Sequence, residues 1–148
     1  MLIRGPVVRV RDHLPMLCGL ALVVWLPGCT TGPKLVIPTG KLLNRGAPLT
    51  SDTKLGVTLT FHADAREGRP PASYVANIDR ESATFTVPGP QGKGIPEGTY
   101  RVSVLLMSIN PTEWMDDVNQ QFSPTNTRVI REVKEGESLT IDLSKPEG

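Results

Sequence analysis

The feature that most constrains the fold of this chain is a set of short segments in which apolar and polar residues alternate. Val57, Leu59 and Phe61 alternate with threonines in one segment, and residues 99–109 repeat the pattern over a longer stretch. A period of two places every second side chain on one face of an extended strand, whereas a helix needs apolar residues three or four positions apart. The pattern therefore predicts strands with one apolar face.

Glycine and proline separate these segments. The chain holds 14 glycines and 14 prolines among 148 residues, and many of them stand between alternating stretches. Such residues favour turns, so we expect an all-β fold over residues 35–148, a β-sandwich of about seven strands. A chain of this size buries about two thirds of its unfolded surface, which is enough to fold without disulfides.

The spacing of the turns also predicts which strands are neighbours. Residues 73–79 and 83–87 flank a tight turn, and residues 128–133 and 138–143 flank another, so we expect two hairpins. The connection over residues 110–127 is long and polar, with one helical turn expected around residues 113–118. On the last strand, alternation predicts that Asp142 points outward.

The first 28 residues differ from the rest of the chain. Three arginines stand among the first eleven residues, and the uncharged run Leu14–Leu26 follows them. A membrane-spanning helix needs about 20 apolar residues, so this run is short for one. A basic start, a short apolar run and a small-residue end are typical of a secretory signal, which we predict over residues 1–28.

The end of this segment, Leu26-Pro27-Gly28-Cys29, resembles the lipobox of bacterial lipoproteins. Three positions match, and Pro27 stands where that motif has a small residue. The resemblance implies that Cys29 is acylated and becomes the mature N-terminus, with residues 29–34 as a lipidated tether. Two or more acyl chains anchor a protein stably in a bilayer. The alternatives are a plain signal peptide cut nearby, with Cys29 an incidental thiol, and an uncleaved N-terminal anchor.

This resemblance also implies where the protein is located in the cell and which charged residues remain after the signal is removed. It implies the bacterial cell envelope, and Thr30, which is not an aspartate, favours the outer membrane. The mature chain carries 13 basic and 14 acidic side chains, and His62 is its single histidine. Such a balance gives no basic surface for nucleic acid, so we expect no nucleic-acid partner.

Residues 40–61 hold Gly40, Gly46, Pro48 and Leu49 before an alternating strand, and residues 92–104 hold Pro96, Gly98 and Tyr100 before another. These two stretches resemble carboxypeptidase-regulatory-like, transthyretin-like domains. The likeness covers most of residues 38–143, and its motifs are turn glycines, a packed tyrosine and alternating apolar positions. It implies an immunoglobulin-like or prealbumin-like β-sandwich, but no activity, because this fold carries many functions. The matching residues are Gly40, Gly46, Pro48, Leu49, Val57, Phe61, Pro96, Gly98, Tyr100, Val102 and Val104.

The chain offers little for catalysis. His62 ends a strand on its polar face, and zinc takes three or four Cys, His or carboxylate ligands. We therefore interpret His62 as a solvated strand residue and predict no catalytic residue, metal or cofactor. A transthyretin-like hydrolase, which would need His and Arg side chains in one cleft, remains an alternative.

Aromatic residues in a loop suggest a binding role instead. Trp114, Met115 and Phe122 lie in the connection over residues 110–127 and form a candidate contact patch for a partner. The alternative is that Trp114 folds down and caps the open end of the sandwich. We therefore predict a membrane-anchored, non-enzymatic lipoprotein that acts as a binding or structural module, with an envelope protein or a glycan as its partner. An accessory subunit of an envelope complex is a further alternative.

Overall fold

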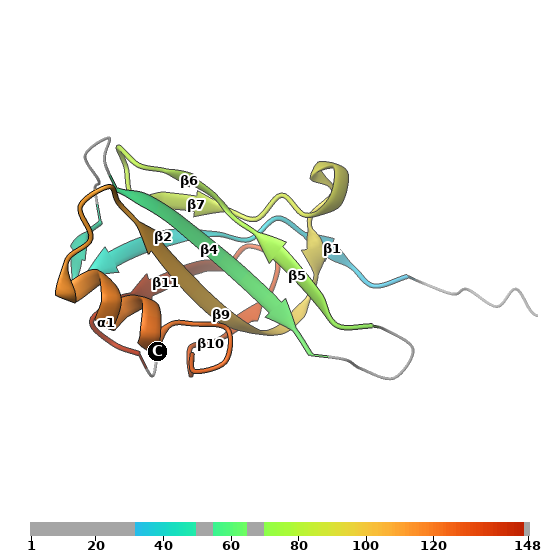
Figure 1. Cartoon of the computed structure of the whole chain (residues 1–148). Coiled ribbons are helices and arrows are strands. Elements are labelled where there is room, and N and C mark those ends of the chain that lie inside the picture. Colours follow the sequence, from blue (N-terminus) through green and yellow to red (C-terminus); the bar gives the residue numbers. More distant parts are fainter. Residues whose placement is uncertain (1–31, 50–54, 65–69, 147–148) are drawn as a thin grey trace, which may run out of the picture. The chain divides into compact units, whose positions relative to one another are not determined.

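Strands dominate the computed structural model, which describes residues 32–49, 55–64 and 70–146 (Figure 1). Its single α-helix in this part is α1 (Glu113–Gln121), and a short 3-10 turn, η1, spans Pro90–Gly92. The expectation of an all-β class is confirmed. The strands are β1 (Leu35–Val36), β2 (Thr39–Asn44), β3 (Ala47–Pro48), β4 (Gly56–Ala63), β5 (Ala72–Val75), β6 (Asn77–Asp79), β7 (Thr84–Thr86), β8 (Ile95–Pro96), β9 (Gly98–Met107), β10 (Ile130–Val133) and β11 (Ser138–Asp142).

These strands form two larger sheets and one small ribbon. The first sheet has the order β10-β9-β4-β5, and the second has the order β11-β2-β7-β6, with β3 beside β2. Strands β1 and β8 make the ribbon. Every pairing is antiparallel except that of β11 with β2, which is parallel.

The core lies between the two larger sheets. Phe61 of β4 and Phe85 of β7 are buried, and their ring centroids are 5.9 Å apart. A side chain at Gly40 on β2 would collide with the Phe85 ring and with the Leu139 carbonyl, so glycine lets the backbone approach the ring. Burying a phenylalanine contributes about 1.5–3 kcal/mol, so burial of the alternating apolar positions predicted from the sequence stabilises the fold.

Helix α1 and the chain after it complete one edge of β9. Strand β10 pairs only with the first part of β9, and beyond it the backbone carbonyls of Val129 and Phe122 accept hydrogen bonds from β9 amides. Further along, the side chain of Asn119 takes the place of a strand residue. Its Oδ1 accepts from the Leu106 amide at 2.6 Å, and its Nδ2 donates to the Leu106 carbonyl at 2.9 Å.

The helix itself is longer than the single turn expected from the sequence. Thr112 caps its first turn by accepting a hydrogen bond from the Met115 amide, and it runs for nine residues. Met115 and Val118 are its buried residues, and they pack in the core. A nine-residue helix is marginal by itself, so packing of this face against the sheet stabilises it.

Of the two predicted hairpins, one is confirmed only in part and the other is wrong. Residues 72–75 form β5, which pairs with β4 in the first sheet, and only β6 takes part in the hairpin. Strands β6 and β7 pair around the turn after Asp79. Strands β10 and β11 do not pair, because β10 joins β9 in one sheet and β11 joins β2 in the other. The guanidinium of Arg131 bridges them instead, donating from Nε and Nη2 to the Thr140 carbonyl at 3.0 and 2.9 Å.

Asp142 is buried, although alternation places it, as predicted, on the face of β11 opposite the core residue Ile141. Its carboxylate accepts hydrogen bonds from the amides of Arg45, Gly46 and Ser144 and from the Ser144 hydroxyl. Arg45 and Gly46 both have positive φ in the turn between β2 and β3, and their amides point at the carboxylate. Burial raises the pKa of Asp142, but these hydrogen bonds outweigh it, and the net pKa lies below its ordinary value.

Candidate functional site

The predicted lipid site lies outside the described residues, whereas the start of the described domain is tied to the rest of the fold through Lys34. Cys29 and the predicted signal over residues 1–28 belong to that outside part. Lys34 is held in place, since its carbonyl accepts a hydrogen bond from the Glu97 amide at 3.0 Å. Its ammonium lies 2.6 Å from a Glu135 oxygen and 3.4 Å from a Glu97 oxygen. These hydrogen bonds raise the pKa of Lys34.

The three residues predicted as a contact patch do not share one exposed surface. Met115 and Phe122 are 4% and 0% exposed, because both belong to the core beneath α1. Trp114 is partly buried and packs against that core, so it alone leaves surface for a partner. The physical reason is that the connection covers the edge of β9 and buries its apolar side chains there.

His62 lies between two serine hydroxyls on the outer face of the first sheet. Its Nδ1 is 2.9 Å from Ser73 Oγ on β5, and its Nε2 is 2.7 Å from Ser103 Oγ on β9. Beside it, Arg101 donates to Asp64 at 2.9 Å. Burial lowers the pKa of His62 and the Arg101 charge lowers it further, while the Asp64 charge opposes this shift.

This cluster was not predicted, because its members are far apart in the chain. Alternation correctly predicted that His62 lies on the polar face of β4. It could not predict the neighbours of His62, because these depend on how β4 pairs with β5 and β9. A neutral imidazole can accept a proton from a hydroxyl, and this is the chemistry that activates serine nucleophiles. Such catalysis also requires a group that orients the imidazole, and here the carboxylate of Asp64 pairs with Arg101 instead.

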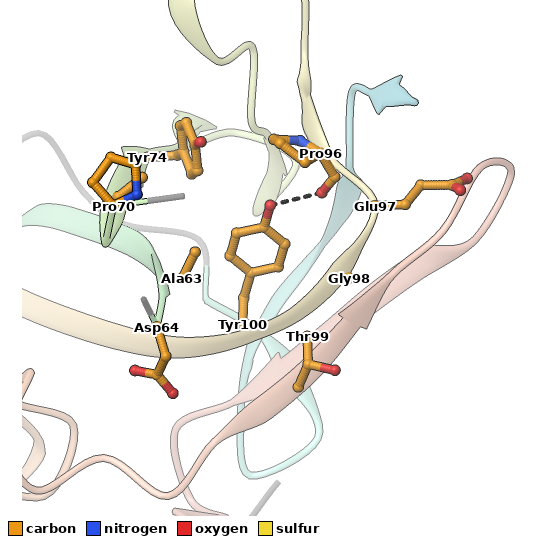
Figure 2. Close-up of a pocket in the computed structure, with 10 residues that line it drawn as sticks. Ala63, Asp64, Pro70, Tyr74, Pro96, Glu97, Gly98, Thr99 and Tyr100 are labelled. Atoms are coloured by element: carbon orange, nitrogen blue, oxygen red, sulfur yellow. Dashed lines mark hydrogen bonds between the residues drawn. The ribbon is translucent and has the colours of Figure 1, made fainter. Parts of the chain in front are cut away.

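A small pocket opens where β4 ends, β5 begins and β8 leads into β9 (Figure 2). Tyr100 is nearly buried beside it, and the Tyr100 hydroxyl donates to the Pro96 carbonyl at 2.6 Å. Tyr74 and Tyr100 meet edge to face, with ring centroids 6.1 Å apart. The residues that line the pocket are Ala63, Asp64, Pro70, Ala72, Tyr74, Pro96, Glu97, Gly98, Thr99 and Tyr100.

The charges at the rim of this pocket are already paired. Asp64 accepts from Arg101, while Glu97 lies beside Lys34 and accepts from the Glu135 amide at 3.1 Å. The pocket is therefore lined by the rings of tyrosine and proline, and the charged side chains at its rim are paired with other groups. Such a lining suits apolar contact better than charge recognition or proton transfer.

Comparisons with known proteins identify no protein that is similar to this chain. No protein family, no curated protein and no solved structure matches this chain. The likeness to transthyretin-like domains and to bacterial lipoproteins therefore stays a prediction. Within residues 32–49, 55–64 and 70–146, no helix has the length and apolarity to cross a bilayer. The same residues bring no group of three or more His, Cys, Asp or Glu side chains together for a metal ion.

Proposed function

We propose that this chain is a lipid-anchored, non-enzymatic envelope protein whose domain acts as a binding or structural module. The observation that carries the proposal is the position of Cys29, which follows a short apolar segment and stands six residues before the first strand. Acyl chains on Cys29 hold the domain at a membrane, and Thr30 favours the outer membrane. The domain then presents its loops to an envelope protein or a glycan.

We further propose that the fold is an immunoglobulin-like β-sandwich of the transthyretin-like type. Tyr100 stands near the start of β9, and its hydroxyl donates to the carbonyl four residues upstream. This arrangement resembles the tyrosine corner of many immunoglobulin-like sandwiches, in which a tyrosine near the start of a strand bonds the backbone a few residues upstream. The facing of Phe61 and Phe85 between two sheets supports the same assignment.

Acylation can be tested directly with the two cysteines of the chain. We expect the full chain, produced in a bacterium with radiolabelled palmitate, to take up label and to yield a mature N-terminus at Cys29 by mass spectrometry. Cys29→Ser should abolish the label, and Cys18→Ser, in the apolar run, should keep it. Unlabelled wild-type protein, or label that survives Cys29→Ser, would overturn the anchor.

Affinity capture tests the binding role. We expect the acylated chain to retain a specific envelope protein or glycan, and Trp114→Ala to weaken that capture because Trp114 is the member of the predicted patch that keeps exposed surface. Ile130→Ala, an exposed apolar position on β10, is the matched control. Equal capture by both variants would exclude Trp114 from the contact.

A hydrolase is the second candidate, and His62 between two serine hydroxyls favours it. Under our main proposal, the protein has no ester or amide hydrolysis that depends on this cluster. Hydrolysis of small activated esters that Ser73→Ala and His62→Gln abolish, and that Ser82→Ala leaves intact, would instead establish a serine hydrolase.

A further inference from the structure

Two apolar side chains stand exposed at the point where the predicted tether enters the domain. Leu35 and Ile37 are 46% and 51% exposed, whereas Val36 between them is 8% exposed and packs in the core. The ribbon of β1 and β8 thus has one face in the core and the other toward solvent. Alternation explains the arrangement, since successive side chains of a strand point to opposite faces.

More apolar surface lies beside Leu35. Leu35 pairs with Pro96 across the antiparallel ribbon, and directly opposed residues place their side chains on one face. Pro96 also lines the pocket with Pro70 and Tyr74, as Figure 2 shows. We call Leu35, Ile37, Pro70, Tyr74 and Pro96 the tether-end surface.

The covalent chain fixes how far this surface can lie from an acylated Cys29. Lys34 is held by the Glu97 amide and by the carboxylates of Glu97 and Glu135. Five residue steps separate Cys29 from Lys34, and a fully extended chain spans at most about 3.6 Å per residue. Lys34 therefore stays within about 18 Å of the lipid attachment in every arrangement of the tether, Leu35 within about 22 Å and Ile37 within about 29 Å.

The charges around this surface argue against attraction to anionic lipid. Lys34 is shared between Glu97 and Glu135, so this group carries a net negative charge. Binding through phosphate groups would require a cluster of Lys or Arg. An apolar surface with a tyrosine is instead typical of the boundary between headgroups and acyl chains.

We propose that the tether-end surface rests on the bilayer to which Cys29 is anchored, with Leu35 and Ile37 at the headgroup boundary. The proposal rests on the proposed lipid anchor and adds an orientation to it. It places the pocket at the membrane and α1 with the loop over residues 122–129 at a different part of the domain, free to meet a partner. The acyl chains supply the affinity, and the apolar contact selects which end faces the lipid.

The mature chain allows a test with a single reporter. Residues 29–148 contain the whole core and one cysteine, Cys29, so they can be coupled through that thiol to zwitterionic phosphatidylcholine vesicles carrying a maleimide lipid. Trp114 is their single tryptophan, so Trp114→Phe removes the background fluorescence. Ile37→Trp in that background then reports contact of the residue that follows β1 with brominated acyl chains.

The matched control is Ile130→Trp in the same background, because Ile130 is 50% exposed and lies on the outer face of the first sheet. We expect bromolipids to quench the Ile37→Trp variant at least about twofold more than the control, since interfacial side chains lie about 5–10 Å into the headgroup region. Leu35→Trp should behave like Ile37→Trp, which guards against a folding defect in one variant. Equal quenching in the Ile37→Trp and Ile130→Trp variants would overturn the orientation.

Chemical coupling separates this test from that of the lipid anchor. If the vesicle experiment fails while palmitate labelling at Cys29 succeeds, the orientation is wrong and the anchor stands. If labelling fails in cells, the proposed function is lost whatever the vesicles show.

Discussion

The two ends of strand β9 satisfy their backbone in different ways. At its start, β10 pairs with β9 in regular register, and the Tyr100 hydroxyl ties the entry of the strand to the Pro96 carbonyl. At its far end no strand of the described residues continues β10, and the Asn119 side chain bonds both backbone groups of Leu106. On this edge of β9 the first end is a repeating ladder, whereas the far end is bonded by isolated backbone carbonyls and by one side chain, that of Asn119. The other edge pairs with β4 as far as Met107.

This difference indicates where single substitutions should do most harm. A regular ladder distributes its hydrogen bonds over many residues, and a lost side chain leaves it intact. The α1 end depends on a few buried groups that no neighbour can replace. We therefore expect substitutions there to cost more stability than substitutions at the start of β9.

The largest effect should come from Phe122→Ala. Phe122 is fully buried under the end of α1, and removing a buried phenylalanine costs about 3–5 kcal/mol through lost transfer energy and a cavity. Chemical denaturation followed by circular dichroism measures the free energy of unfolding. A loss below about 1 kcal/mol would show that the α1 segment is not part of the cooperative core.

Asn119→Ala should come next, with a loss of about 1–3 kcal/mol. The substitution leaves the amide and the carbonyl of buried Leu106 without their side-chain partner. Gln121→Ala, at an exposed position of the same helix, is the control and should change stability little. If both variants unfold at the same denaturant concentration, Asn119 does not replace a strand residue.

Tyr100→Phe probes the other end and should cost less, about 0.5–1.5 kcal/mol. It removes one hydroxyl, which donates to the Pro96 carbonyl, and keeps the ring contacts with Phe61 and Tyr74. The same denaturation measurement applies, with Tyr74→Phe as the control. A larger loss than that of Asn119→Ala would reverse the ranking of the two ends.

The smallest effect is a pH dependence from His62, beside the middle of β9. Burial, and then the charge of Arg101, lower the pKa of His62 below its ordinary 6.5, so the folded state binds this proton less tightly than the unfolded state. Stability from this group is complete above about pH 6.5 and falls as pH drops toward the folded pKa. His62→Gln should flatten the stability profile between about pH 7.5 and 5. An unchanged slope would assign the pH dependence to other groups.

Sequence alone predicted the local features well. Alternation located β4, β7 and β9 and the buried positions Leu59, Phe61 and Val102, because a period of two leaves one face of a strand apolar whatever it packs against. It failed at the last two strands, since alternation does not state which sheet a strand joins.

The contacts around the candidate functional residues could not be predicted from alternation. The Ser73 and Ser103 partners of His62 come from strands β5 and β9. Two of the four hydrogen bonds of Asp142 come from a turn 97 and 96 residues earlier in the chain. Met115 and Phe122 are likewise buried because the segment that carries them packs along the edge of β9. Each of these results from long-range register.

The sequence by itself determined the β class and the polar and apolar faces of most strands, because each depends on residues close together in the chain. The lipid site at Cys29 stays a prediction from the same kind of local pattern. Tertiary structure decided the separation of β10 from β11, the burial of Asp142 and the neighbours of His62. The physical reason is that backbone pairing and close packing join residues across the chain, and only the complete fold satisfies all their hydrogen bonds together.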